Sequence, residues 1–68
     1  MHGEVDATFV VDSSGQALPE TLQILGSSHE AFSREVKRIL PLLRYYPAEL
    51  AGRPTAQVVT QHFEFSAH

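Results

Sequence analysis

Four histidines and a pair of adjacent serines are the first side chains to consider in this 68-residue chain as metal ligands or as catalytic groups. The histidines are His2, His29, His62 and His68. No two of them stand three or four residues apart on one predicted helix, the spacing that directs two imidazoles at one metal ion. The first and the last lie at the ends of the chain. The pattern therefore predicts no metal site.

Ser27 and Ser28 precede His29, and these residues have the types of a nucleophile and its general base. Glu30 follows Ser27 by three residues, however, which is the capping-box spacing of a helix start, with Ser28 as the alternative cap. Hydroxyls that cap a helix are already occupied by backbone groups. We therefore expect neither catalysis nor a bound cofactor.

Composition limits the chain to one small domain held together by packing. It has no cysteine, 43% hydrophobic residues and a net charge of −3, from eight acidic and five basic side chains. The charge disfavours nucleic acid as a partner, and the apolar runs are far shorter than the roughly 20 residues that span a bilayer. We expect a domain over residues 3–65, with 1–2 and 66–68 as flanking residues.

A first strand is predicted over Val5–Val11, where apolar and polar residues alternate. Every second side chain of this strand then faces the core. Asp12 to Gly15 form a turn, since aspartate caps turns and glycine adopts positive φ at little cost. The chain is expected to reverse there.

A second, short strand is predicted from about Thr21 to Leu25, with Leu22 and Ile24 facing inward. Pro19 cannot donate to a ladder and predicts an irregular lead-in. Gly26 and the two serines then interrupt the apolar pattern.

A helix is predicted to begin at Ser27 or Ser28 and to end or kink near Leu40, because Pro41 lacks an N–H and crowds the preceding turn. Its apolar residues recur at helical spacing and can cover a small sheet. They are Phe32, Val36, Ile39, Leu40 and Leu43.

A third strand is predicted over Thr55–Phe65, after a loop that contains Gly52 and Pro54. Gln57 and Gln61 fall on its inward phase, which a bulge or incomplete helix cover would explain. The uncovered face of the sheet either binds something or is solvated. The predicted core comprises Val5, Phe9, Leu22, Ile24, Phe32, Val36, Leu40, Tyr45, Val59 and Phe63.

The predicted order of elements is β, β, α, β, which makes the fold α+β. If the helix returns the chain by the favoured right-handed connection, the third strand runs antiparallel to the first. The expected architecture is a three-stranded antiparallel sheet in the order 2-1-3 with one helix packed on one face. The second and third strands are then the edges.

Over Gly3 to Phe65 the chain resembles the C-terminal domain family of TonB energy transducers. The resemblance lies in the order and spacing of short motifs rather than in any single one. They are Gly3 and Val5, Asp12 and Gly15, Ser27 and Ser28, Phe32, Tyr45 with Pro47 and Ala48, Gly52 and Pro54, and Phe65. The stretch from Gly15 to Ser27 is longer than in many members, and Gln57 and Gln61 replace the usual apolar residues.

The resemblance implies a periplasmic peptide-binding module whose parent protein is anchored in the inner membrane. Through regions upstream of this segment, ExbB and ExbD would couple the parent to the proton motive force. The TonB box of an outer-membrane transporter would add to the third strand by β-augmentation, which needs no reactive side chain. The implied site is the strand Val58, Val59, Thr60, Gln61, His62, Phe63 and Glu64.

An alternative function remains for the same fold. It is an interaction domain that forms a homodimer through this edge, or that serves an envelope sensor or a secreted protein with no transporter partner. A transmembrane helix and a proline-rich spacer upstream in the parent gene would favour the transducer.

Overall fold

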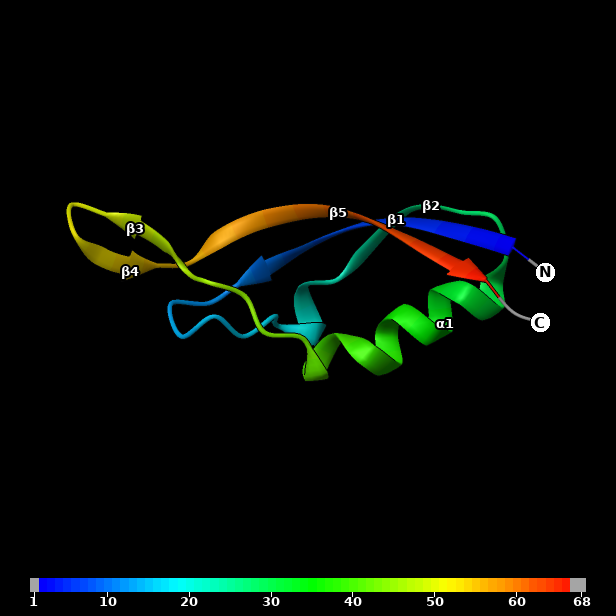
Figure 1. Ribbon diagram of the computed structural model, residues 1–68, viewed down its shortest axis with the longest axis horizontal. Coiled ribbons are helices and arrows are strands. Elements are labelled where there is room, and N and C mark those ends of the chain that lie inside the picture. Colours follow the sequence, from blue (N-terminus) through cyan, green and yellow to red (C-terminus); the bar gives the residue numbers. More distant parts are fainter. Residues whose placement is uncertain (1, 67–68) are drawn as a thin grey trace.

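One long strand, β1 (His2–Val11), lies at the centre of the sheet in the computed structural model, which describes residues 2–66. It pairs antiparallel with β2 (Gln23–Ser27) on one side and with β5 (Gln57–Ser66) on the other. The order β2-β1-β5 confirms the predicted arrangement 2-1-3. The sheet is strongly twisted along its length (Figure 1).

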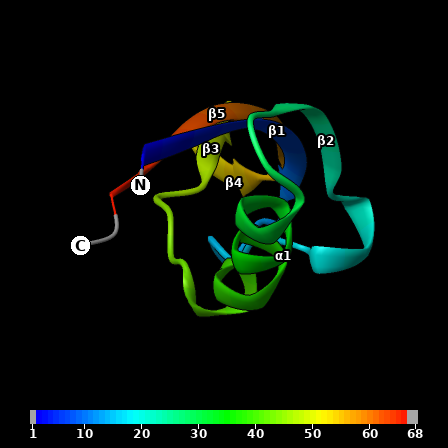
Figure 2. The same ribbon diagram turned by 90° about the vertical axis from the view of Figure 1, so that its right-hand side faces the viewer.

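Helix α1 (Glu30–Ile39) lies under one face of this sheet (Figure 2). The alternating residues of β1 point toward it and are fully buried, as predicted. The core cluster consists of Val5, Ala7, Phe9, Val11, Ala17, Val36, Leu40 and Phe63. Of the predicted core, Leu22, Ile24, Phe32, Tyr45 and Val59 are only partly buried around that cluster. Ala17 was not predicted, because an alanine in a polar turn region gives no periodic signal.

The helix ends where proline was predicted to end it. After Ile39 the chain tightens into a 3₁₀ turn, η2 (Leu40–Leu42), which contains Pro41. Among residues 2–66, no helix is both long and apolar enough to cross a membrane.

The predicted capping box at the start of the helix is wrong. The N-cap is His29, which makes no side-chain cap bond. The Ser27 hydroxyl bonds instead to the backbone of His29, and Ser28 donates its N–H to the Glu4 carbonyl at 3.0 Å. Ser27 pairs with Val5 and Ser28 bonds to Glu4, so both residues belong to the end of the β1–β2 pairing.

Strand β2 begins two residues later than predicted because Pro19 starts a 3₁₀ turn, η1 (Pro19–Thr21). The Thr21 hydroxyl donates to the Leu18 carbonyl and accepts the Val10 N–H at 2.8 Å, which holds Thr21 outside the ladder. A bulge follows in β2, where Leu25 is the extra residue and is 60% exposed.

A second, two-stranded sheet replaces the predicted loop before the third strand. Strands β3 (Ala48–Leu50) and β4 (Arg53–Thr55) form a hairpin that projects beyond the main sheet (Figure 1). Ala51 and Gly52 both have positive φ at its tip, the geometry of a two-residue type I′ turn. Thr55 ends this hairpin, so the predicted third strand Thr55–Phe65 is corrected to Gln57–Ser66. The projection stretches the molecule to 44 × 20 × 16 Å.

The turn after β1 is held by side-chain bonds of the predicted kind. The Asp12 carboxylate accepts the N–H groups of Ser14 and Gln16 and the Ser14 hydroxyl. These bonds lower the pKa of Asp12. Gly15 has φ +89° and lies so close to the Tyr45 carbonyl that a Cβ could not be accommodated. Its carbonyl accepts the Tyr45 N–H at 2.8 Å, which ties this turn to the chain after the helix.

Candidate functional site

Strand β5 is the longest edge of the main sheet. It pairs with β1 at ten successive positions, from His2 opposite Ser66 to Val11 opposite Gln57, without a bulge. Within residues 2–66 no other strand pairs with its outer side. All seven predicted site residues, 58 to 64, lie on this edge.

The direction of each backbone group on β5 follows from the bonds that β1 makes on its other side. Glu4 and Val10 accept the N–H groups of Ser28 and Leu18, so these even-numbered residues of β1 point toward the β2 side. Backbone direction alternates along a strand, and β1 has no bulge of its own. Its odd-numbered residues therefore bond to β5.

Odd-numbered residues of β1 pair with odd-numbered residues of β5, such as Ala7 with Gln61. The even-numbered residues of β5 consequently direct their N–H and C=O groups away from the sheet. They are Val58, Thr60, His62 and Glu64. Four residues thus present a regular row of eight backbone donors and acceptors along the open edge.

The side chains of β5 divide between the two faces of the sheet. Val59 and Phe63 face the helix, whereas the even-numbered residues face solvent on the uncovered face. Gln61 also points inward, where its Oε1 accepts the Tyr45 hydroxyl at 2.6 Å. Burial raises the pKa of Tyr45. This bond, rather than a bulge, explains Gln61 on the inward phase.

The other edges are less suited to pair with a long segment. Strand β2 has five residues and contains the bulge, which bends the strand and disrupts the regular alternation of its backbone groups. Strands β3 and β4 have three residues each, and Pro54 in β4 has no N–H to donate. Strand β5 is therefore the candidate site.

His62 lies on the uncovered face among three carboxylates. Its Nδ1 is 2.6 Å from Asp6 Oδ1, and its Nε2 is 3.3 Å from Glu4 and 3.6 Å from Glu64. The hydrogen bond to Asp6 and the surrounding negative charges raise the pKa of His62. His62 thus links the two long strands through its contacts with Asp6 and Glu4.

The raised pKa predicts a pH-dependent contribution of His62 to stability. The contribution is fully present below the ordinary histidine pKa of about 6.5 and is lost as the pH rises through the raised folded-state pKa. We expect His62→Gln to lower the melting temperature clearly at about pH 5.5 and little at about pH 9. Thermal unfolding at both pH values checks this. His29→Gln is the control, because it removes a histidine whose ring lies near Phe32, outside the cluster around His62. An equal loss at both pH values would contradict the prediction.

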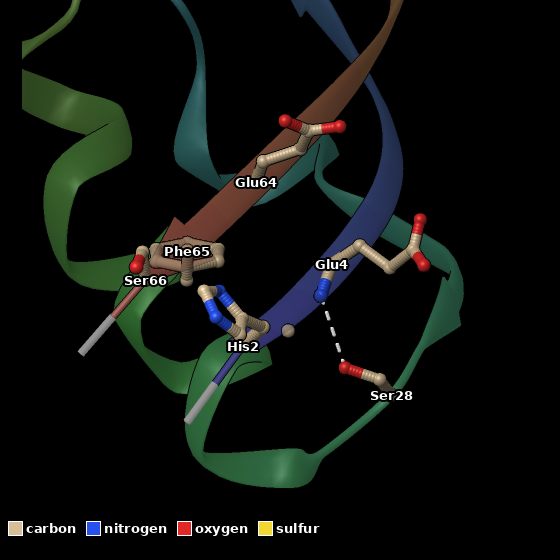
Figure 3. Close-up of a pocket in the computed structure, with 7 residues that line it drawn as sticks. His2, Glu4, Ser28, Glu64, Phe65 and Ser66 are labelled. Carbon is tan, nitrogen blue, oxygen red and sulfur yellow. Dashed lines mark hydrogen bonds between the residues drawn. The ribbon is translucent and has the colours of Figure 1, made fainter. Parts of the chain in front are cut away.

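An open pocket of about 450 Å³ lies where β1 begins and β5 ends (Figure 3). The hydrogen bond from the Glu4 N–H to the Ser28 hydroxyl, 3.0 Å long, closes one side. The Phe65 ring stacks on that of Phe32 on the helix side, whereas the carboxylates of Glu4 and Glu64 lie near His62 on the uncovered face. The complete lining of the pocket is His2, Gly3, Glu4, Ser28, Glu64, Phe65 and Ser66.

The C-terminal domain of the Gram-negative bacterial TonB protein is the family whose model matches this chain, over residues 1–67. The chain belongs to this family. No curated protein sequence matches it significantly, so the assignment rests on the family model. The match covers nearly the whole chain and confirms the resemblance seen in its motifs.

A TonB C-terminal domain is an interaction domain of the Gram-negative cell envelope. The family contacts outer-membrane transporters, and it is a family of transducer domains rather than of enzymes. In this TonB domain the hydroxyls of Ser27 and Ser28 bond to backbone groups of His29 and Glu4. Within residues 2–66, no three side chains of metal-binding type are arranged to hold a metal ion.

Proposed function

We propose that this TonB domain captures an extended segment of an outer-membrane transporter, its TonB box, along the open edge of β5. The segment becomes a fourth strand of the main sheet. Its backbone bonds to the outward N–H and C=O groups of the even-numbered residues 58 to 64. The mode is β-augmentation, in which main-chain hydrogen bonds supply affinity and side chains supply selectivity.

The regular, unpaired edge of β5 is the observation that carries the proposal. Proteins usually protect exposed edges with short strands, bulges or charges. Strand β5 has ten residues and no bulge in its pairing with β1, and it contains no proline and no lysine; its one carboxylate, Glu64, lies near its end. An edge left in this state suits a partner strand.

The same proposal places the domain in the periplasm, within a parent protein anchored in the inner membrane. ExbB and ExbD act on upstream regions of that parent and couple it to the proton motive force. A strand bonded along its whole length resists a pull along its axis, because several hydrogen bonds must break together. This geometry suits the transmission of force to a transporter.

Titration of the ¹⁵N-labelled domain with peptides from periplasm-facing transporter segments tests the proposal. We expect saturable shifts of backbone amides that are largest at Val58, Thr60 and His62. The same peptides with a central proline are the matched control, because they lack one N–H and cannot form a continuous strand. They should bind more weakly.

Shifts confined to α1 or to the β3–β4 hairpin would contradict the proposal. Sedimentation at each concentration separates the alternative in which the edge pairs with a second copy of the chain. A homodimer that persists at saturating peptide would favour the alternative function and contradict capture on β5.

A further inference from the structure

We infer that the segment captured on β5 places a side chain with a hydrogen-bond acceptor, such as a hydroxyl or an amide, opposite Gln61, between apolar side chains opposite Val59 and Phe63. The inference rests on the proposed function and specifies the chemistry and the register of the partner. Three features lead to it: the unbonded end of one amide, the direction from which water reaches that end, and the apolar residues on either side.

The side-chain amide of Gln61 has one bonded end and one unbonded end. Its Oε1 accepts the Tyr45 hydroxyl at 2.6 Å, which holds the amide in one orientation. Its Nε2, which carries two N–H donors, bonds to no group among residues 2–66. Within the same residues, no side-chain nitrogen or oxygen is both buried and unpaired, so this Nε2 is in contact with water. Gln61 therefore offers donors to solvent from a half-buried position.

Water reaches this amide from the open edge of β5. On the opposite side Gln61 pairs with Ala7 of β1, which is fully buried. Helix α1 packs mainly under β1 and β2, away from the outer side of β5. A strand added to β5 would thus cover the Nε2 of Gln61 and displace its water.

A fourth strand would place one side chain directly opposite that of Gln61. Because Gln61 directs its backbone groups to β1, an antiparallel addition makes it a member of the closer, non-hydrogen-bonded type of pair. Side chains opposite each other on one face have Cβ atoms about 4.5–5.5 Å apart. An acceptor at that position can bond to Nε2, whereas an apolar side chain would cover the N–H groups and leave them unpaired.

The neighbours of Gln61 distinguish this position from the rest of the edge. Val59 is partly buried and Phe63 is buried on the same face, two residues to either side, and both favour apolar partner side chains. Backbone groups alone would let a segment slide along the edge by two residues at a time, because their pattern repeats. One acceptor between two apolar side chains selects a single register.

Threonine and valine, exchanged at each position of the tightest-binding transporter peptide, test the inference. The two side chains have nearly the same shape and similar strand propensity, and they differ by one hydroxyl. We expect one position at which threonine binds about threefold to twentyfold tighter than valine. Two residues to either side, valine should bind at least as tightly as threonine. In ¹⁵N spectra the side-chain amide of Gln61 should shift further with the threonine peptide, while that of Gln57 should respond equally to both.

Variants of the domain assign the preference to Gln61. Gln61→Val should abolish it, so that valine binds at least as tightly as threonine at that position. Gln57→Val is the matched control, because it removes the same type of side chain from an exposed position near the start of β5. It should leave the preference intact. If Gln61→Val does not fold, as judged by circular dichroism, the shift of the Gln61 side-chain amide in the parent domain decides alone.

The outcomes separate the two proposals. If transporter peptides bind on β5 but threonine and valine bind equally at every position, the inference is wrong and the proposed function stands. A threonine preference that survives Gln61→Val also overturns the inference, as does a Gln61 side-chain amide that responds equally to both peptides. If no peptide shifts the backbone amides of β5, the proposed function fails, and the inference fails with it.

Discussion

Replacing Phe9 by alanine is expected to unfold most of the domain. Phe9 lies at the middle of β1, is 1% exposed and packs its ring 5.8 Å from that of Tyr45. Deleting a buried phenylalanine ring costs about 3–5 kcal/mol. A 68-residue chain has a free energy of unfolding of about 3–10 kcal/mol, so little stability would remain. Thermal and urea unfolding followed by circular dichroism measure the loss.

Val58→Ala is the control for that substitution, because it shortens an apolar side chain that is 71% exposed on the neighbouring strand. Its expected effect is within about 0.5 kcal/mol. Each 1 kcal/mol moves the melting temperature of such a domain by about 4–8 °C. A fall of less than about 5 °C for Phe9→Ala would therefore contradict the assigned core.

Proline at two adjacent positions of β5 is expected to give opposite results. Gln61→Pro removes an N–H that bonds to β1 at Ala7, in the middle of the ladder, and should unfold the domain. Thr60→Pro removes an outward N–H and should leave the domain folded. It should weaken peptide binding about twofold to tenfold or more, since one backbone hydrogen bond is lost and the added ring crowds the partner.

Alanine at the same two positions separates the backbone from the side chain. Gln61→Ala loses only the bond from the Tyr45 hydroxyl, so the difference from Gln61→Pro reports the ladder. Thr60→Ala should bind peptide much like the parent domain. If Thr60→Pro unfolds while Gln61→Pro folds, the assigned direction of the backbone groups is reversed. If both proline variants fold and bind normally, the edge is not the site.

The main sheet and the helix were predictable because their side chains repeat with the period of the element. Alternation over β1 and the spacing of Val36 and Leu40 are set by which residues must face one small core. The strand order then followed from the direction of each connection. The end of α1 followed from Pro41, which acts through its own missing N–H.

The hairpin and the helix cap were missed for physical reasons. Strands of three residues are too short for a periodic signal. Pro54 also argued against a strand, although a proline is tolerated where its missing N–H would point to the unpaired side of a hairpin. The two serines have side chains that could cap a helix. The hydroxyl of Ser28 accepts the N–H of Glu4 instead, a residue 24 positions away in the chain. Local spacing cannot reveal such a long-range competitor.

The candidate site depends on backbone groups, so residue types alone could not define it. The resemblance to the family predicted the strand, while the alternation of directions along it required the pairing of β1 with both neighbours. The cluster around His62 was also missed. His62 is distant in sequence from Glu4 and Asp6, and only the register of β1 against β5 brings it to them.

Amide hydrogen exchange of β5, with and without bound peptide, tests most directly that its open edge is where a partner strand adds. In the free domain we expect fast exchange at Val58, Thr60, His62 and Glu64 and slow exchange at the residues between them. Saturating peptide should slow the fast set at least about tenfold, because their N–H groups become bonded in a fourth strand. Unchanged exchange at these four amides in the fully bound domain, or new protection only on β2 or the hairpin, would contradict the account.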